Sequence, residues 1–242
     1  MQSGDNIPVS TGAWSFDGAA ATNFDDHVSK SVPMYEHAHK LVVGLTDFFG
    51  RSGSKIIDIG CSTGSLLEQI AKDNNGKKDL SLVGIDPVAD MIELSNSRFQ
   101  ANTYKGIDFQ SINGSYMDIE FGPETSSMIT SVYTIQFVHP SVRQSFVSKI
   151  YNELEWGGAF IFFEKIRASD ARFQDLFTTL YNEYKVANGY TPSEILAKSL
   201  SLKGVLEPFS SLGNRGLLER AGFKDVEPIF QYLCFQGLLA VK

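Results

Sequence analysis

The sequence has little cysteine, no long apolar run and no excess of basic residues. Its only cysteines, Cys61 and Cys234, lie far apart in the chain, which excludes a disulfide framework or a zinc knuckle and suits a reducing compartment. No segment reaches the roughly 18 apolar residues that a membrane-spanning helix requires. The first residues also lack the basic and apolar regions of a secretory signal. We therefore expect a cytoplasmic protein that does not associate with membranes.

Lys and Arg total 21 against 28 Asp and Glu, which gives a net charge of −7. This balance argues against a protein that a broad basic face holds on nucleic acid, so we expect no stable nucleic-acid binding. The 242 residues are 43% hydrophobic and 20% charged, values that are ordinary for a soluble globular protein. We expect a flexible lead-in over residues 1–12, which are small and polar, and a single domain over residues 13–242.

Short apolar runs alternate with amphipathic helical segments through the first two thirds of the chain. The expected strands are 55–59, 80–85, 107–112, 128–133 and 159–163, and the expected helices are 31–50, 65–72, 89–100 and 141–154. Helical segments at 170–188 and 193–203 are not followed by strands, so we expect a helical cap over about 166–212. Residues 226–230 and 232–241 then predict a closing antiparallel pair. The pattern predicts a Rossmann-like α/β fold with a seven-stranded, mostly parallel sheet.

The clearest chemical signal is the turn that follows the first expected strand. An apolar run, 55–59, leads into Gly60, Cys61, Ser62 and Gly64 before a helix begins. Glycines there permit tight backbone geometry and close approach of a ligand, and a helix start presents free N–H groups. Such a turn at the carboxyl end of a parallel strand is where doubly wound sheets bind nucleotides. Cys61 itself is expected to pack rather than act as a nucleophile.

Two acidic residues narrow the choice of nucleotide. Ser62 breaks the dinucleotide fingerprint, and no P-loop lysine follows. Asp86 ends the second expected strand, where a carboxylate can accept both ribose hydroxyls, and Asp58 is suited to lie near a cationic amino-acid head group. Together they favour S-adenosyl-L-methionine, while NAD or a turn without a ligand remains open.

Several segments together resemble a known family. The matching segments include Trp14-Ser-Phe-Asp17, Ser31-Val-Pro-Met-Tyr35, Asp58-Ile-Gly-Cys-Ser62, Ala187-Asn-Gly-Tyr190 and Ala221-Gly-Phe223. They resemble the class I methyltransferase superfamily and, within it, the carboxy-S-adenosyl-L-methionine synthase family, over nearly the whole chain from Trp14. The resemblance implies the class I methyltransferase fold, S-adenosylmethionine or its carboxylated derivative as the cofactor, and a homodimer.

The resemblance also implies a set of cofactor contacts. They would come from Tyr35, the Gly60-Cys61-Ser62 turn, Asp86 with the adjacent Pro87, Ser115, Tyr116 and Val132. Ser115 and Tyr116 stand where the family has an Asp-Ile pair beside the adenine, and Val132 stands where it has Asn. An Arg that binds the carboxylate of the carboxylated product falls on Leu217. Leu cannot pair with a carboxylate, whereas an Arg fork supplies two parallel hydrogen bonds.

For this reason we expect a methyltransferase that acts on an unidentified, small-molecule acceptor. The alternative is carboxy-S-adenosylmethionine synthesis with prephenate, which by the resemblance serves transfer-RNA wobble-uridine modification. A third hypothesis is a non-catalytic S-adenosylmethionine-binding protein. The acceptor would enter between Tyr35, the mouth of the fourth strand from Tyr133 to His139, and the cap.

We name Tyr133 and His139 as the catalytic candidates. His139 could act as a base at neutral pH, although it could equally begin a helix before Pro140. Residues 25–27 (Asp-Asp-His) match no standard metal-site spacing, so we expect a loop or cap there and no metal.

Overall fold

The computed structural model describes residues 1–5 and 7–242. The strands are β1 (Lys55–Ile59), β2 (Leu80–Asp86), β3 (Ile107–Asn113), β4 (Ser126–Val132), β5 (Leu154–Lys165), β6 (Asp225–Tyr232) and β7 (Phe235–Val241). The α-helices are α1 (Ala19–Thr22), α2 (Phe24–Ser31), α3 (Tyr35–Phe49), α4 (Ser65–Asp73), α5 (Ala89–Gln100), α6 (Arg143–Glu153), α7 (Ala171–Ala187), α8 (Pro192–Ser201) and α9 (Ser211–Ala221). Short 3-10 helices are η1 (Tyr116–Asp118), η2 (Ile135–Phe137) and η3 (Pro140–Val142).

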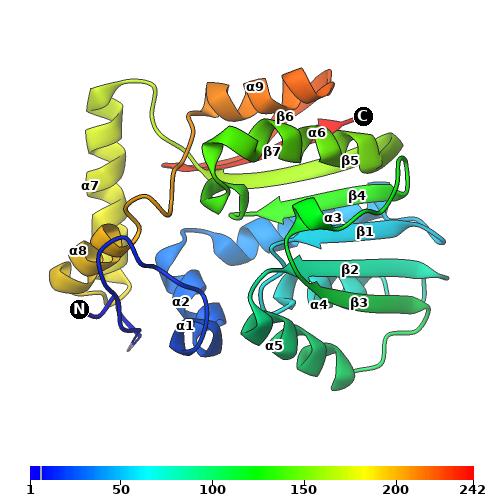
Figure 1. The fold of residues 1–242 in the computed structure, drawn as a ribbon, viewed down its shortest axis with the longest axis horizontal. Helices are drawn as coiled ribbons and strands as arrows, with labels where there is room; N and C mark the ends of the chain where they lie inside the picture. Colours follow the sequence, from blue (N-terminus) through cyan, green and yellow to red (C-terminus); the bar gives the residue numbers. More distant parts are fainter. Residues whose placement is uncertain (6) are drawn as a thin grey trace.

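The strands form one seven-stranded sheet in the order β3-β2-β1-β4-β5-β7-β6 (Figure 1). Strands β1 to β5 run parallel to one another, and β7 lies antiparallel between β5 and β6. This confirms the predicted mostly parallel sheet with its antiparallel closing pair. The order reverses beside β1, so the carboxyl ends of β1 and β4 open a crevice of the kind that binds ligands in such sheets.

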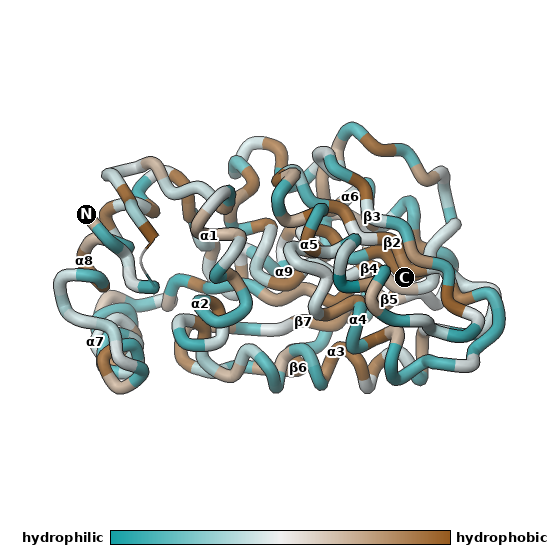
Figure 2. The backbone as a smooth tube through the Cα atoms, turned by 90° about the horizontal axis from the view of Figure 1, so that it is seen from below, coloured by the Kyte–Doolittle hydropathy of each residue, from teal (hydrophilic) through white to brown (hydrophobic). Residues whose placement is uncertain are grey.

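Helices cover both faces of the sheet because the strands carry apolar side chains on both sides. Ile57, Ile59 and Phe160 pack with α6 and α9, whereas Ile56 and Leu82 pack with α3, α4 and α5. Successive side chains of a strand point to opposite faces, so a run such as β1 serves both layers. Figure 2 shows the hydrophobic positions concentrated along β2, β4 and β5 at the centre of the molecule.

One predicted helix is divided into two in the structure. We expected a helix over 31–50, but α2 ends at Ser31 and α3 begins at Tyr35. Pro33 has no N–H to donate, and Met34 has the left-handed backbone angle φ of 60°. The break turns the chain, so that α2 and the start of α3 both face the carboxyl ends of the strands.

The cap consists of α7, α8 and the N-terminal segment, which lie together at one end of the sheet (Figure 1). Helix α8 starts with a capping box, in which Thr191 and Glu194 satisfy each other's backbone N–H groups. Helix α7 is different from the helices on the sheet faces because none of its residues is buried. It therefore forms a wall rather than part of the core.

Residues 1–5 and 7–12 pack on the domain, in contrast to the flexible lead-in that we expected. Ile7 is buried with Trp14 and Ala20 in a small apolar cluster, and the Gly12 N–H donates to the Leu200 carbonyl at 3.0 Å. The apolar side chains of Ile7 and Trp14 lose contact with water when they pack against α1 and α8, which offsets the entropy cost of ordering the segment. Asn6 lies outside the described residues.

Among the residues that the structure describes, no helix combines the length and apolar character needed to cross a membrane.

Candidate functional site

A cavity of about 910 Å³ lies between the carboxyl ends of the strands and the cap. Its floor comes from the ends of β1, β2, β4 and β5, and its walls come from α2, α7, α8 and the segment that precedes α1. This volume lies at the upper end of the range typical of small-molecule sites. The position agrees with the crevice predicted at the turn after β1.

The turn after β1 is held tightly against β2. The N–H groups of Gly60 and Cys61 both donate to the Ile85 carbonyl, at 2.8 and 3.0 Å. Gly60 has a φ of 76°, and a Cβ atom there would overlap the Thr134 side chain. Only glycine fits this position beside Thr134, and the backbone of Gly60 forms part of the cavity lining. Cys61 and Ser62 line the cavity, whereas Gly64 starts α4 and is not part of the lining.

Asp86 lies at the end of β2 with its carboxylate fixed by the backbone. Its Oδ2 accepts from the Ser62 N–H at 3.0 Å, and its Oδ1 accepts from the Val88 N–H at 2.9 Å. Burial raises the pKa of Asp86, while these two hydrogen bonds act to lower it. The carboxylate and Pro87 both line the cavity. A carboxylate oriented in this way can accept hydroxyl groups of a ribose.

Asp58, on β1, lies at the floor of the same cavity. Its Oδ1 accepts a hydrogen bond from the Thr130 hydroxyl at 2.6 Å. Burial raises the pKa of Asp58 to about 7, and the nearby charge of Asp86 adds to this effect. Two buried carboxylates favour a cationic ligand, because a positive charge compensates for the lost hydration of the ionised form. The arrangement fits the ribose and the charged amino group of S-adenosylmethionine.

An aromatic side of the cavity is built by Tyr35 and Tyr133. Their rings stack with centroids 6.3 Å apart. Tyr133 has a left-handed φ of 59°, and its N–H donates to the Phe163 carbonyl at 2.7 Å, so the backbone holds the ring at the end of β4. Its buried hydroxyl has no hydrogen-bond partner within residues 1–5 and 7–242. Val132 also lines the cavity here and presents only methyl groups.

Three lysines form what we call the basic wall of the cavity, namely Lys165, Lys185 and Lys198. Lys165 and Lys185 lie over the Tyr181 ring at 4.7 and 4.3 Å from its centroid. No carboxylate in the described part of the chain lies within ion-pair distance of any of the three ammonium groups.

Burial acts on these unpaired charges. Burial lowers the pKa of all three lysines. The pKa of Lys185 falls to about 8 and the pKa of Lys198 falls to about 6. An anionic ligand would raise these pKa values again, because a carboxylate stabilises the ammonium form. Lys198, whose pKa of about 6 leaves it mostly uncharged at pH 7, would gain a proton when such a ligand binds.

A hydrogen-bond network that we did not predict joins the N-terminal segment to the cap. His27 Nδ1 lies 2.8 Å from Asp5 Oδ2, and the Tyr190 hydroxyl donates to the same oxygen at 2.9 Å. These residues lie on three separate segments, so no local spacing connects them. Asp25 instead accepts hydrogen bonds from Thr63 and Arg98, which pins α2 over the turn.

His139 does not reach the cavity, contrary to our prediction of a catalytic role. It is exposed, and its Nδ1 accepts from the Ser141 N–H at 3.3 Å at the start of η3. The side chain is held there because it satisfies a free N–H at a helix start. The alternative interpretation, a role at the helix entry, is the one that the structure supports.

Ser115 and Tyr116 are also absent from the cavity lining. The Ser115 hydroxyl caps η1 by accepting from the Met117 N–H. Tyr116 is buried in the core against Phe146, and its hydroxyl donates to Glu153 at 2.6 Å. A buried phenol needs such a partner, and this one holds the ring in the core rather than in the cavity.

The structure does not place Leu217 at the cavity, where a carboxylate-binding Arg would be required. It is 3% exposed and belongs to the apolar core between α9 and the sheet, and it is not part of the cavity lining. An Arg in its place would enter a hydrophobic core rather than a ligand pocket. The position therefore provides no argument about a carboxylate in the cavity.

Comparison with known proteins shows the family. A methyltransferase domain family matches residues 56–158. A carboxy-S-adenosyl-L-methionine synthase from Staphylococcus epidermidis is 34% identical over 95% of this chain and 97% of its own length. The synthase from Campylobacter lari is 35% identical over 94% of both chains. A SAM-dependent methyltransferase from Aquifex aeolicus has the same fold, with a TM-score of 0.59 and 14% identity over 93% of this chain and 98% of that one.

Proposed function

Since the chain belongs to the family of carboxy-S-adenosyl-L-methionine synthases, we propose that it makes carboxy-S-adenosylmethionine from S-adenosylmethionine and prephenate. The product would serve transfer-RNA wobble-uridine modification, as the resemblance implies. The observation that supports this proposal is the basic wall. Its three lysines have no ion-pair partner in the part of the chain that the structure describes, and they share a cavity with Asp58 and Asp86. We therefore place carboxy-transfer ahead of the methyl transfer that we first expected.

The two sides of the cavity suit two ligands of opposite charge. Asp86 accepts the ribose hydroxyls of S-adenosylmethionine, and Asp58 faces its cationic part. The lysines of the basic wall bind a dicarboxylate, whose negative charges replace the water that burial removes from the ammonium groups. The protein aligns the two ligands and excludes water between them.

The structure does not support the reason for which we expected methyl transfer. It depended on Leu217 standing where a carboxylate-binding Arg is required, and Leu217 is a core residue of α9. Lysines from the end of β5 and from the cap offer the positive charge instead. Arg143, a cation on α6, is buried outside the cavity, where it donates to the carbonyls of Val138 and Gln136.

Methyl transfer to an acidic acceptor is a second candidate, and one observation favours it. Val132 lines the cavity with methyl groups at the place where the family resemblance puts an Asn. The loss of that amide removes a hydrogen-bonding group from the end of β4. Product identity separates the two reactions.

The identity of the nucleoside that is bound to the purified protein tests the proposal. The protein is denatured directly after purification, and the released nucleoside is identified by mass spectrometry. Carboxy-S-adenosylmethionine supports the proposal. S-Adenosylhomocysteine supports methyl transfer, and an empty protein that also fails to consume S-adenosylmethionine with prephenate supports a binding protein without catalysis.

The outer surface of α7 supports the homodimer that the resemblance implies. Phe173, Leu176 and Leu180 follow helical spacing, and they are 51%, 54% and 45% exposed. The opposite side of α7 contributes Tyr181 and Lys185 to the cavity. Packing of this outer stripe against a second copy would cover an apolar surface and hold the cavity wall in place.

A further inference from the structure

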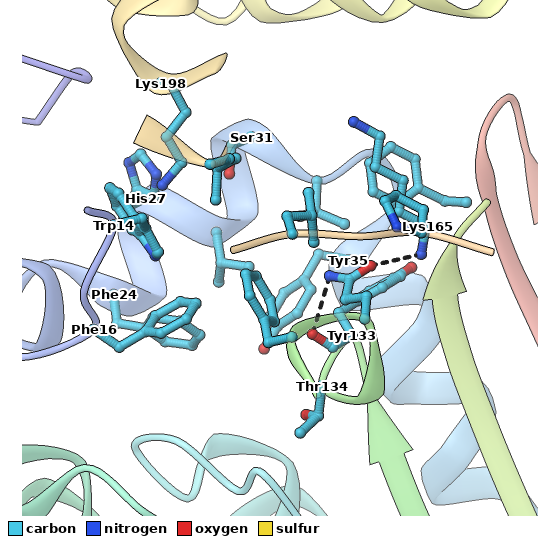
Figure 3. A pocket seen from close by; sticks show the side chains of 18 of the residues that line it. Trp14, Phe16, Phe24, His27, Ser31, Tyr35, Tyr133, Thr134, Lys165 and Lys198 are labelled. Carbon is cyan, nitrogen blue, oxygen red and sulfur yellow. Dashed lines mark hydrogen bonds between the residues drawn. The ribbon is translucent and has the colours of Figure 1, made fainter. Parts of the chain in front are cut away.

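The side-chain amide of Gln136 lies between the ends of β4 and β5 at the cavity. Its Nε2 donates to the Tyr133 carbonyl at 3.1 Å, and its Oε1 accepts from the Lys165 N–H at 2.9 Å. Figure 3 draws these two hydrogen bonds as dashed lines between Tyr133 and Lys165. Gln136 is 7% exposed and lines the cavity. One buried amide thus joins the aromatic side of the cavity to the basic wall.

The first of these bonds continues the pairing of the sheet beyond the last residue of β4. The parallel pairing of β4 with β5 ends where Val132 meets Phe163. Lys165 lies two residues further along β5, where β4 no longer supplies a carbonyl for its N–H. The Gln136 amide accepts from that N–H instead, and a backbone N–H in such a place needs an acceptor.

The second bond acts on a strained position of the backbone. Tyr133 has a φ of 59°, which a residue other than glycine keeps only when its surroundings hold it there. Its N–H donates to the Phe163 carbonyl, and its own carbonyl accepts from Gln136. The amide therefore completes the pair of contacts that fixes Tyr133, whose ring stacks on Tyr35.

The main chain of Gln136 is itself held from outside the cavity. Its carbonyl accepts from Arg143 Nη2 at 3.0 Å and from the Glu207 N–H at 3.0 Å. Arg143 is 2% exposed, and its Nε donates to the Val138 carbonyl at 2.8 Å. Hydrogen bonds from a charged donor are stronger than those between neutral groups. Helix α6 and the segment before α9 therefore fix the place from which the amide reaches the cavity.

The chemistry of the amide suits this bridge. A primary amide carries an acceptor and a donor at its tip, whereas an ionised carboxylate only accepts and a thioether does neither strongly. Thr134, in the same segment, lies against Gly60 of the turn after β1. The segment from Thr134 to Gln136 thus contacts the turn, Tyr133 and Lys165 together.

We propose that Gln136 is a positioning residue, which sets the separation between Tyr133 and Lys165 and so aligns the nucleoside with the anionic substrate. The inference rests on the proposed function, because it concerns the two substrates of that reaction. Reacting groups need close alignment, and a displacement of about 1 Å lowers a rate by about 100-fold. Gln136 acts through the two residues that it joins.

Gln136→Met keeps the length of the side chain and removes both hydrogen bonds. Steady-state kinetics of the full-length protein are measured with S-adenosylmethionine and prephenate varied in turn. We expect kcat to fall about 30- to 100-fold, while the KM for each substrate changes less than about threefold. Gln136→Glu keeps an acceptor for the Lys165 N–H and loses the donor to Tyr133, so it should lower kcat by about tenfold.

Gln144→Met is the matched control. The Gln144 amide also bridges two elements, since it donates to the Leu217 carbonyl on α9 and accepts from Arg220 Nε, but it does not line the cavity. This variant should keep the wild-type kcat even where its melting temperature falls. A Gln136→Met variant with a lowered melting temperature and a wild-type kcat would show a structural role alone and overturn the inference. A raised KM with an unchanged kcat would overturn it too.

Crystal structures of the wild type and of the two Gln136 variants test the positioning without turnover. We expect Tyr133 to leave its left-handed φ in Gln136→Met and its ring to separate from Tyr35. Unchanged positions of Tyr133 and Lys165 in both variants overturn the inference, and they leave the proposed function standing if the wild type forms carboxy-S-adenosylmethionine. A displaced Tyr133, in a protein whose wild type forms no such product, overturns the proposed function and supports the positioning role alone.

Discussion

The acidic side of the cavity belongs to the sheet, and the basic wall belongs mainly to the cap. Asp58 and Asp86 stand on β1 and β2, and both carboxylates are fixed by hydrogen bonds from their neighbours. Lys185 and Lys198 stand on α7 and α8 and have no carboxylate partner in the described part of the chain. The sheet side is thus preformed for one ligand, and the cap side lacks the charges that a second ligand brings. The comparison supports the proposal that the two substrates bind to different layers of the molecule.

Replacement of Asp86 should weaken the binding of S-adenosylmethionine at the sheet side of the cavity, and this is the largest effect that we expect. Asp86→Ala removes an oriented carboxylate, and hydrogen bonds to a charged group contribute about 1.5–3 kcal/mol each. If two ribose hydroxyls are lost, we expect the affinity for S-adenosylmethionine to fall by about 100-fold or more. Calorimetry measures this change.

The control for this prediction is Asp108→Ala, which removes an exposed carboxylate from β3. It should bind S-adenosylmethionine as the wild type does. An Asp86→Ala variant with wild-type affinity would show that the nucleoside binds elsewhere.

Loss of the basic wall should affect only the second substrate. The double variant Lys165→Met with Lys185→Met removes two cations and keeps most of their apolar stems. We expect the KM for prephenate to rise by about 10- to 100-fold, from the energy of charge-assisted hydrogen bonds, while the affinity for S-adenosylmethionine stays constant. Steady-state kinetics with each substrate varied in turn measures both quantities.

Lys224→Met, at an exposed position just after α9, is the matched control and should leave both constants unchanged. A parallel loss of affinity for S-adenosylmethionine and prephenate in the double variant would contradict the separation of the two sides.

The pKa of Asp58 predicts how pH acts on the sheet side. Burial raises this pKa to about 7 from an ordinary value of 3.8, so the folded protein holds a proton that the unfolded chain releases. The stability of the ligand-free protein should therefore fall as pH rises from about 4 to 7. A cationic ligand favours the ionised carboxylate, so the affinity for S-adenosylmethionine should rise about tenfold per pH unit below the pKa and level off above it.

Titrations between pH 5.5 and 8 test this prediction, with Asp58→Asn as the comparison. The variant should show a flat profile near neutral pH. A wild-type affinity that does not change over this interval would show that Asp58 is not the group that meets the cation.

A substitution in the outer stripe of α7 should have the smallest effect on activity. Leu176→Glu places a charge in an apolar stripe and should convert the proposed dimer to a monomer, because burying an unpaired carboxylate is costly. Since α7 also lines the cavity, we expect activity to fall about two- to fivefold, in line with a modest loss of order in one wall. Light scattering combined with size-exclusion chromatography measures the mass.

Leu212→Glu is the control, because Leu212 is 76% exposed on α9. It should leave the mass unchanged. A Leu176→Glu variant that remains a dimer would place the interface on another surface.

The sheet side could be predicted from the sequence because its signals are local. The run 55–59, the glycine at position 60 and an acidic residue at the end of the next strand lie within one βαβ unit, and the structure brings them together. The seven-stranded, mostly parallel sheet was predicted from the alternation of strands and helices in the sequence.

The cap side could not be predicted, because it joins segments that are distant in the chain. Asp5, His27 and Tyr190 meet only when the N-terminal segment packs on the cap. His139 and Tyr116 were misplaced because sequence position does not tell which way a side chain points. His139 caps η3, and Tyr116 turns into the core to reach Glu153. The prediction about Leu217 was wrong for a related reason. An alignment without gaps matched this core position to a family Arg that contacts a ligand.

The most direct test is whether the carboxyl carbon of prephenate appears on the nucleoside. The purified protein is incubated with S-adenosylmethionine and with prephenate that carries a heavy-carbon label in its transferable carboxyl group, and the nucleosides are analysed by mass spectrometry. Our account predicts labelled carboxy-S-adenosylmethionine, and only about 2–20% of the wild-type amount in the Lys165→Met with Lys185→Met variant at the same prephenate concentration, set near the wild-type KM, as the expected rise of about 10- to 100-fold in KM implies. Unlabelled S-adenosylmethionine recovered intact, or S-adenosylhomocysteine as the only product, would contradict it.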